Sequence, residues 1–352
     1  MASDSSRGGF TVLVTGAASA LGRRVVALTV ADPAVDRVIA LDRRSLAGLP
    51  TSVDAHEVDL GQVDIKPLAE GADVIVHLAQ ATGATGTPIG EAGDGELARL
   101  VLAAASAVGA QHVVLLSSAT AYGAWANNPV PLTEDAPLRP NPGVPSAFEK
   151  AELERAAAEW RDDHPGATVA LLRPTVTVCP EGNGWLARAL ARSSALPITD
   201  DEPPAQFLDV ADLASAIDVA RRARLDGPRN VAPDGWIAGD TVRALAGGAP
   251  RLRLPERLAL RLAGLRWQWG LAPTPPALLP FTVHPWVVAN DRLKGAGWEP
   301  SSSNEEAYVG AHEAGPWATL SPRRRQELAL GAAGVAILGT AVGIAALVRS
   351  RR

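Results

Sequence analysis

Hydrophobic residues gather in short uninterrupted runs along the first half of the chain, and segments with helical spacing separate these runs. The runs cover residues 10–15, 38–41, 73–79, 113–116 and 168–172, and the more polar residues 53–58 are expected to form a further strand. Short apolar runs rich in β-branched residues are typical of buried strands in a parallel sheet. Between them, apolar side chains recur at helical spacing over residues 21–30, 97–107 and 146–160, and a shorter helix is expected at 63–70. This alternation predicts an α/β fold with a doubly wound parallel sheet.

The first unit, Phe10–Asp42, reads as a strand, a glycine turn, a helix and a second strand that ends in an acid. Gly16 has no Cβ, so backbone N–H groups can approach a diphosphate there, and Gly22 lets the helix pack closely. The helix N-terminus offers further donors to the same anion. Asp42 is placed to accept a hydrogen bond from a ribose 2′-hydroxyl. A carboxylate there would repel a 2′-phosphate, which favours NAD over NADP, although Arg43 and Arg44 weaken that preference. A plain βαβ unit with chance glycines is the alternative.

The segment Thr15-Gly16-x-x-Ser19-x-x-Gly22 resembles the T-G-x-x-G-x-x-G signature of the extended short-chain dehydrogenase/reductases. That branch includes the NAD-dependent epimerases and dehydratases acting on nucleotide sugars. Ser19 replaces the middle glycine, and its Cβ is expected to loosen the approach of a diphosphate. The resemblance implies a Rossmann-type fold and NAD as cofactor. The cofactor-binding positions it implies are Gly16, Ala18, Ser19, Leu21, Gly22, Asp42, Arg43, Asp59, Leu60, Leu78, Ala79, Lys150 and Pro174.

Two further segments resemble the catalytic motifs of this family. Ser117–Gly123 is similar to S-S-x-x-V-Y-G, in which Ser118 would hydrogen-bond the reacting oxygen of the substrate. Residues 146–154 are similar to Y-x-x-x-K-A-x-x-E, which implies that Lys150 holds the nicotinamide ribose. The tyrosine position, the general acid/base of the family, holds Ser146, and a serine hydroxyl is a far poorer acid. The resemblance therefore implies Ser118, Ser146 and Lys150 as catalytic residues, with a Ser/Thr-rich turn and a solvated lysine as alternatives.

Two further positions, His77 and Asp94, are not expected to be catalytic. His77, at the end of an apolar run, is expected to be structural. Asp94 holds the place where the family usually has an asparagine.

The later chain resembles the family more loosely. Arg173–Pro180 is similar to the loop that leaves the cofactor domain, Phe207–Ala214 to the return, and 289–298 to the closing segment. The predicted domains are a Rossmann domain at 8–180, joined by part of 205–235, and a smaller discontinuous substrate-binding region at 181–320.

Composition excludes several classes of function. The net charge of −5 gives no reason to expect a nucleic-acid partner, and the single cysteine, Cys179, excludes intramolecular disulfides. The six histidines lack metal-ligand spacing, so no metal site is expected. The N-terminus lacks the apolar core of a signal peptide, so we expect the first domain in the cytosol.

The C-terminal tail differs in kind, because Leu328–Val348 is a run of 21 residues without a charge. This length suits a helix that crosses ~30 Å of hydrocarbon, and a basic linker at 321–327 precedes it. We expect a single-pass protein of the cell membrane with its large domain cytoplasmic; a buried helix is the alternative. Gly339-x-x-x-Gly343 would allow a homodimer. The tryptophans and arginines that would lie at headgroup level, or instead in a core or pocket, are Trp267, Trp269, Trp317, Arg257, Arg261 and Arg266.

Together these patterns predict an NAD-dependent epimerase/dehydratase-like oxidoreductase at a membrane. Its substrate would be a small molecule with a reacting hydroxyl or carbonyl, such as a sugar nucleotide. The missing phenol leaves a second hypothesis open, an NAD-binding scaffold or redox-sensing membrane protein without turnover.

Overall fold

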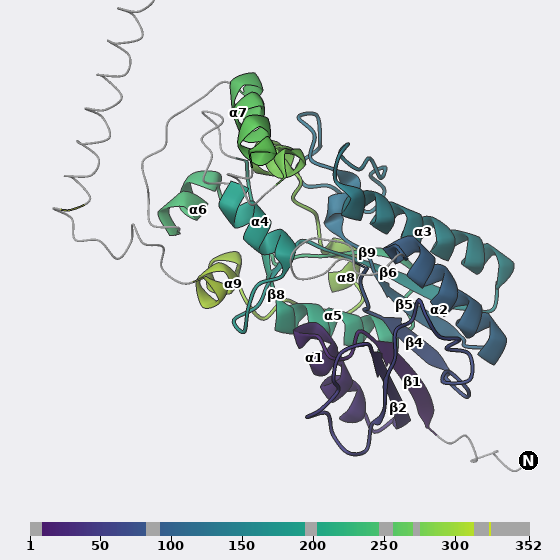
Figure 1. Cartoon of the computed structure of the whole chain (residues 1–352). Coiled ribbons are helices and arrows are strands. Elements are labelled where there is room, and N and C mark those ends of the chain that lie inside the picture. Colours follow the sequence, from purple (N-terminus) through teal and green to yellow (C-terminus); the bar gives the residue numbers. More distant parts are fainter. Residues whose placement is uncertain are drawn as a thin grey trace, which may run out of the picture.

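Seven parallel strands form the central sheet of the chain (Figure 1). The computed structural model describes residues 9–81, 92–193, 203–245, 256–269, 275–312 and Arg324. The strand order is β3-β2-β1-β4-β5-β6-β9, which reverses between β1 and β4 as in a Rossmann-type sheet. The strands are β1 (Phe10–Thr15), β2 (Val35–Asp42), β3 (Asp54–Glu57), β4 (Val74–His77), β5 (His112–Leu116), β6 (Thr168–Pro174) and β9 (Gly227–Val231). This confirms the predicted α/β fold.

Helices cover both faces of the sheet, which explains why the central strands β1, β4 and β5 are mostly apolar and buried. Helices α1 (Ala20–Val30) and α5 (Val210–Arg222) pack together on one face. Helices α2 (Asp94–Val108) and α3 (Pro145–Asp163) pack together on the other (Figure 1). Strand β1 shows the consequence, since Val12 and Val14 belong to the core under α1 and α5, whereas Leu13 belongs to the core under α2 and α3.

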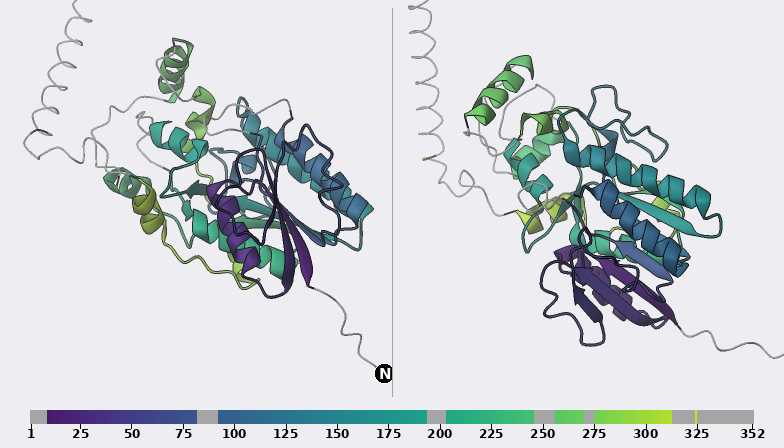
Figure 2. Two further views of the ribbon diagram at one scale, coloured as in Figure 1. Left: turned by 60° about the horizontal axis from the view of Figure 1, so that its bottom comes forward. Right: turned by 45° about the vertical axis from the view of Figure 1, so that its right-hand side comes forward.

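A second, smaller part lies beyond the carboxyl ends of the later strands (Figure 2). Its core includes Tyr122, Phe281 and Trp286. Its elements are η1 (Ala119–Tyr122), β7 (Val176–Val178) paired in parallel with β8 (Phe207–Asp209), α4 (Trp185–Ser193), α6 (Gly239–Leu245), α7 (Glu256–Gln268), η2 (Pro276–Thr282) and α9 (Asn304–Ala311). The chain also returns to the sheet through α8 (Asp291–Lys294), after which Trp298 is buried and donates a 2.9 Å hydrogen bond to Ser215 Oγ on α5.

Two expectations from the sequence are wrong. Residues 63–70 form turns rather than a helix, since Pro67 has no N–H to donate and Asp64 Oδ1 accepts the N–H of Lys66 instead. The exit loop after β6 contains β7, which needed a partner strand about thirty residues later and so had no local signal.

The predicted membrane span is not part of the described structure. Leu328–Val348 and Trp317 lie outside the described residues, as does the linker 321–327 apart from Arg324. Within the part of the chain that is described, no helix is long and apolar enough to cross a bilayer.

Candidate functional site

Two glycines shape the turn between β1 and α1. Gly16 has φ +72°, and a Cβ there would lie 2.6 Å from the backbone nitrogen of Ala79. A Cβ on Gly22 would lie 2.7 Å from Cα of Ala17, so the first turn of α1 rests directly on the glycine turn. Both positions therefore need glycine for close packing of backbone against backbone. The concave backbone surface that results, which we call the glycine cradle (residues 16–22), fits a diphosphate.

Ser19 stabilises this cradle through its side chain. It is the N-cap of α1, and its hydroxyl accepts the N–H of Gly22 at 2.8 Å while donating to the carbonyl of Gly16 at 2.8 Å. The N–H groups of Ala20 and Leu21 follow the cap and have no acceptor within the helix. These two donors and the positive end of α1 are therefore the part of the cradle that can bind an anion.

Asp42 lies where the sequence predicted it, at the end of β2 beside the cradle. Its carboxylate accepts the N–H of Ala18 at 2.9 Å, so acid and cradle are in direct contact. Arg44 also binds it, through its own N–H at 2.9 Å, Nε at 3.1 Å and Nη2 at 3.0 Å. Burial raises the pKa of Asp42, but the hydrogen bonds from Arg44 and Ala18 outweigh burial and hold this pKa below its usual value. A ribose would have to displace the Arg44 guanidinium to reach the carboxylate.

The other predicted adenosine-side positions surround the same turn. Leu78 and Ala79 follow β4, and their backbone lies against Gly16. Asp59 and Leu60 follow β3, where Leu60 is buried and Asp59 is exposed and accepts the N–H of Gly61. Arg43 is exposed beside Asp42. Because β3, β2, β1 and β4 are neighbours in the sheet, these segments share one carboxyl edge.

Lys150 lies further along that edge and is paired with a residue that we had not predicted as its partner. Its side chain projects from α3, is only 6% exposed, and its Nζ lies 2.8 Å from Asp94 Oδ2 and 3.0 Å from the carbonyl of Leu116. Asp94 begins α2, is 2% exposed, and also accepts the N–H of Ala81 at 2.5 Å. Burial raises the pKa of Asp94, but the charge of Lys150 and the hydrogen bonds from Ala81 and Lys150 together outweigh burial and keep this pKa below its usual value.

The ammonium of Lys150 has three protons, of which these two contacts take two. Among the described residues one donor is therefore left for a ribose hydroxyl. The lysine thus fits the ribose-binding role that the resemblance implied.

His77 lies at the end of β4, near this ion pair. Its Nδ1 is 2.8 Å from Oγ1 of Thr15, and its Nε2 is buried with no hydrogen-bond partner among the described residues. Burial, followed by the charge of Lys150, lowers the pKa of His77 to about 4. The imidazole is therefore neutral near pH 7.

The two serines and Pro174 complete the predicted set. Ser118 is half-buried after β5, and its Oγ accepts a 2.8 Å hydrogen bond from Oγ1 of Thr120. Ser146 is half-buried in the first turn of α3, one turn before Lys150. Pro174 ends β6 and is buried. Adjacent strands β5 and β6 thus place Ser118 and Pro174 on the same edge as the cradle.

The two tyrosines of the chain both make other contacts. Tyr122 is buried, donates to Asn230 Oδ1 at 2.8 Å and accepts from Arg173 Nη1 at 2.5 Å. Burial raises the pKa of Tyr122 to about 12. Arg173 in turn pairs with Glu154 at 2.6 Å, so this tyrosine belongs to a buried structural network. Tyr308 lies in α9 and stacks on His312, with the ring centroids 4.2 Å apart.

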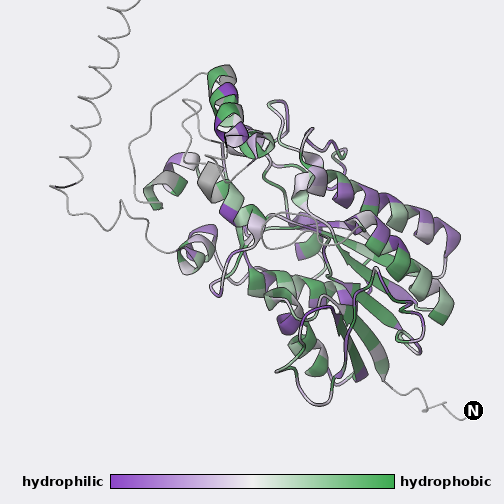
Figure 3. Cartoon of the chain, in the orientation of Figure 1, coloured by the Kyte–Doolittle hydropathy of each residue, from purple (hydrophilic) through white to green (hydrophobic). Residues whose placement is uncertain are grey.

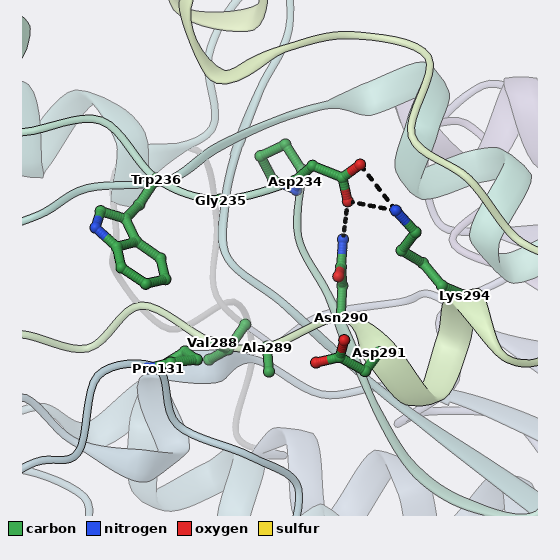
Figure 4. A pocket seen from close by; sticks show the side chains of 10 residues that line it. Pro131, Asp234, Gly235, Trp236, Val288, Ala289, Asn290, Asp291 and Lys294 are labelled. Atoms are coloured by element: carbon green, nitrogen blue, oxygen red, sulfur yellow. Dashed lines mark hydrogen bonds and ion pairs between the residues drawn. The ribbon is translucent and has the colours of Figure 1, made fainter.

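A surface cavity of about 370 Å³ lies beyond the carboxyl end of β9 (Figure 4). Asp234, on its wall, accepts from Asn290 at 2.9 Å and from Lys294 at 2.8 Å. These bonds tie α8 to the end of β9. The residues that line it are Pro131, Pro233, Asp234, Gly235, Trp236, Val288, Ala289, Asn290, Asp291 and Lys294, none of which the sequence predicted as a site residue.

Among the described residues, no group of three or more His, Cys, Asp or Glu side chains could hold a metal ion.

Sequence reasoning missed two contacts of the site. The clamp of Arg44 on Asp42 had a local signal, an arginine two residues after the acid. The Asp94–Lys150 pair had only the departure from the family asparagine as a signal.

Relatives of known sequence cover much of the chain. Uncharacterized proteins of Mycobacterium bovis (Mb0513) and Mycobacterium tuberculosis (Rv0501) are 28% identical over 252 residues, 68% of this chain and 66% of theirs. The chain thus matches just under two thirds of the length of these curated relatives.

Solved structures share the fold. MoeE5 in complex with UDP-glucose and NAD is 20% identical with a TM-score of 0.64, covering 86% of this chain and 97% of that one. The Thermus thermophilus UDP-glucose 4-epimerase in complex with NAD is 19% identical with a TM-score of 0.62, at the same coverage. The family model described as "NAD dependent epimerase/dehydratase family" matches residues 12–232. NAD is the cofactor of this family, and its diphosphate and ribose fit the cradle and acids described above. The chain belongs to the NAD-dependent epimerase/dehydratase family.

Proposed function

We propose that this chain is an NAD-dependent oxidoreductase of the epimerase/dehydratase type that acts on a hydroxyl or carbonyl of a sugar nucleotide. The observation that carries this proposal is the glycine cradle on one sheet edge with Asp42 and the buried Lys150. The sugar nucleotides bound in the structural neighbours, such as UDP-glucose, support the substrate class. When bound, NAD supplies a nicotinamide ring that takes up and returns a hydride.

The residues of this chain would divide the work of binding and proton transfer. The cradle binds the diphosphate, Asp42 the adenosine ribose and Lys150 the nicotinamide ribose. Ser118 holds the reacting oxygen of the substrate. Ser146, or a water beside it, occupies the place of the proton-transferring group, one turn before Lys150 on the same face of α3.

A second candidate function is an NAD-binding scaffold or redox sensor without turnover. The Asp94–Lys150 pair favours this second function. Because the Lys150 ammonium forms an ion pair with a buried carboxylate, it stabilises the charge of a neighbouring acid/base less. Loss of a general acid/base typically lowers a rate 10²–10⁴-fold.

The experiment that separates the two uses the full chain with NAD and a panel of UDP- and dTDP-sugars. Product formation, or absorbance of the reduced nicotinamide, by the native chain and its loss in Lys150→Ala would support the enzyme. Turnover only after Ser146→Tyr would support the scaffold. Failure to bind NAD at millimolar concentration would reject both.

We also propose that Leu328–Val348 anchors the chain in the cell membrane as a single span, with the large domain cytoplasmic. The support is the uncharged length of the segment, its flanking arginines and the cytosolic supply of NAD. Membrane fractions should retain the full chain after alkaline extraction; release into the soluble fraction would reject the anchor. Cross-linking that depends on Gly339 and Gly343 would support the homodimer.

A further inference from the structure

Helix α7 presents a stripe of large apolar side chains to solvent. Leu258, Leu262, Leu265 and Trp269 are spaced four, three and four residues apart, so they share one face of a helix. Their exposed fractions are 44%, 39%, 43% and 71%. Trp269 follows the last residue of α7, and its N–H donates to the carbonyl of Leu265 at 3.1 Å, which continues the helical turn. We call these four residues the α7 stripe.

The side of α7 opposite the stripe is only partly buried, since Leu260 and Trp267 on that side are 36% and 44% exposed. Ala263, which helical spacing places away from the stripe, is buried, and α7 packs against η2. Both views of Figure 2 show α7 at the end of the molecule remote from β1 and β2. Figure 3 colours much of α7 as hydrophobic, interleaved with hydrophilic positions. The stripe is therefore an exposed apolar face on a helix that contacts the molecule at Ala263 and η2, as a contact surface is.

Arginines flank the stripe on both sides. Arg261 and Arg266 are exposed, and helical spacing places one on each edge of the stripe. Residues 256–269 contain three arginines and one acid, Glu256. An apolar face edged by basic side chains, with tryptophan at its end, matches the chemistry of a bilayer interface with anionic headgroups. A contact with a second protein copy gives no reason for basic residues along both edges.

We propose that α7 docks on the surface of an anionic phospholipid bilayer, with the stripe at the acyl boundary and Arg261 and Arg266 at the lipid phosphates. The same chain carries the uncharged run Leu328–Val348 after α9, separated from it by residues 313–327. A linker of that length reaches at most ~50 Å, so a bilayer that held this run would be near the folded part. The proposal concerns a surface remote from β1 and β2 and does not rest on the proposed catalytic activity, although the proposed membrane anchor would bring a bilayer close to it.

The test attaches an environment-sensitive fluorophore to α7 in the full chain. Cys179 is replaced by alanine, and the probe is placed at Leu262→Cys. The matched control is Leu100→Cys on α2, which has the same exposed fraction, 39%. Each protein is reconstituted into vesicles of phosphatidylcholine, with or without phosphatidylglycerol, and nitroxide-labelled lipids serve as quenchers.

With phosphatidylglycerol present, the probe at position 262 should shift to the blue and be quenched by nitroxide lipids, whereas the probe at position 100 should do neither. Arg261→Gln and Arg266→Gln should each lower the ratio of docked to undocked protein about five-fold, which is the effect of removing one basic charge near an anionic surface. Three results would overturn the proposal: no quenching at 262 in either vesicle, equal quenching in both, or a blue-shifted but unquenched probe. The last result would mean that another copy, or another segment of the chain, covers the stripe.

Discussion

The two ends of the cofactor site are stabilised by different kinds of interaction. At the diphosphate end, backbone contacts among Gly16, Ala17, Gly22 and Ala79 decide the shape. At the other end, where we propose that the nicotinamide binds and which we call the nicotinamide end, buried side-chain charges meet, above all those of Asp94 and Lys150. Backbone shape cannot change without moving the first strand and helix, whereas a charge can change while the fold remains. The difference suggests how a chain can retain the NAD cradle of its family and alter the proton chemistry at the other end.

The largest effect is expected from Lys150→Met. Asp94 would stay buried and charged without its partner, and breaking a buried pair in this way costs about 3–5 kcal/mol of unfolding free energy. The double variant Lys150→Met/Asp94→Asn should recover most of the loss, because no unpaired charge is left. Urea unfolding of the single and double variants measures both values.

Lys294→Met is the control for that cycle. Lys294 also pairs with an aspartate, Asp234 at 2.8 Å, but both side chains are exposed. Its loss should stay within the error of the unfolding experiment. A Lys150→Met variant as stable as this control would mean that the nicotinamide end does not depend on the buried pair.

At the other end, Gly22→Ala tests the backbone contact. The new Cβ would meet Cα of Ala17 at 2.7 Å and push α1 off the turn. Overpacking of this kind costs up to about 3 kcal/mol, and we expect NAD affinity to fall by at least about ten-fold because the donors of the cradle move. Calorimetric titration with NAD measures the affinity. Gly166→Ala, with nothing within 4 Å of its Cβ, should change neither quantity; equal behaviour of the two variants would refute the contact argument.

The pH dependence of stability should also differ between the ends. An unfolded histidine takes up its proton near pH 6.5, whereas folded His77 stays neutral to about pH 4. The unfolded state therefore binds more protons between these values, and stability falls as the pH drops from 6.5 to 4. The contribution of Asp42, whose folded pKa lies below 3.8, is present above that pH and is lost only in stronger acid.

The variant His77→Gln measures the contribution of His77 to this pH dependence of stability. The loss of unfolding free energy between pH 7 and pH 5 should be smaller in this variant by about 2 kcal/mol. His112 has a pKa also lowered to about 4 by burial, but it starts β5 at the opposite edge of the sheet. His112→Gln should therefore show a similar change, and the two changes should add. An unchanged pH profile in His77→Gln would show that this imidazole is accessible to protons when folded.

Much of this fold could be predicted because its signals are local. The apolar runs predicted most of the central strands, and Gly16, Gly22 and Asp42 predicted the cradle, since each acts within one βαβ unit. The ion pair of Asp94 with Lys150 joins two helices through tertiary packing, which no local pattern encodes. The cap that the Ser19 hydroxyl forms on α1 was not predicted, because only the Cβ of Ser19 was considered.

The smallest effect is expected from Arg44→Ala, which tests whether Arg44 competes with the cofactor ribose for Asp42. The guanidinium of Arg44 occupies the carboxylate of Asp42, yet its side chain is 54% exposed, so the pair is worth little. Its removal should raise NAD affinity about three-fold, because the ribose no longer has to displace it, and should weaken NADP relative to NAD by removing a positive charge. Arg37→Ala, at the far end of β2, should leave both affinities unchanged. A loss of NAD affinity in Arg44→Ala would instead mean that this arginine binds the adenosine side of the cofactor directly.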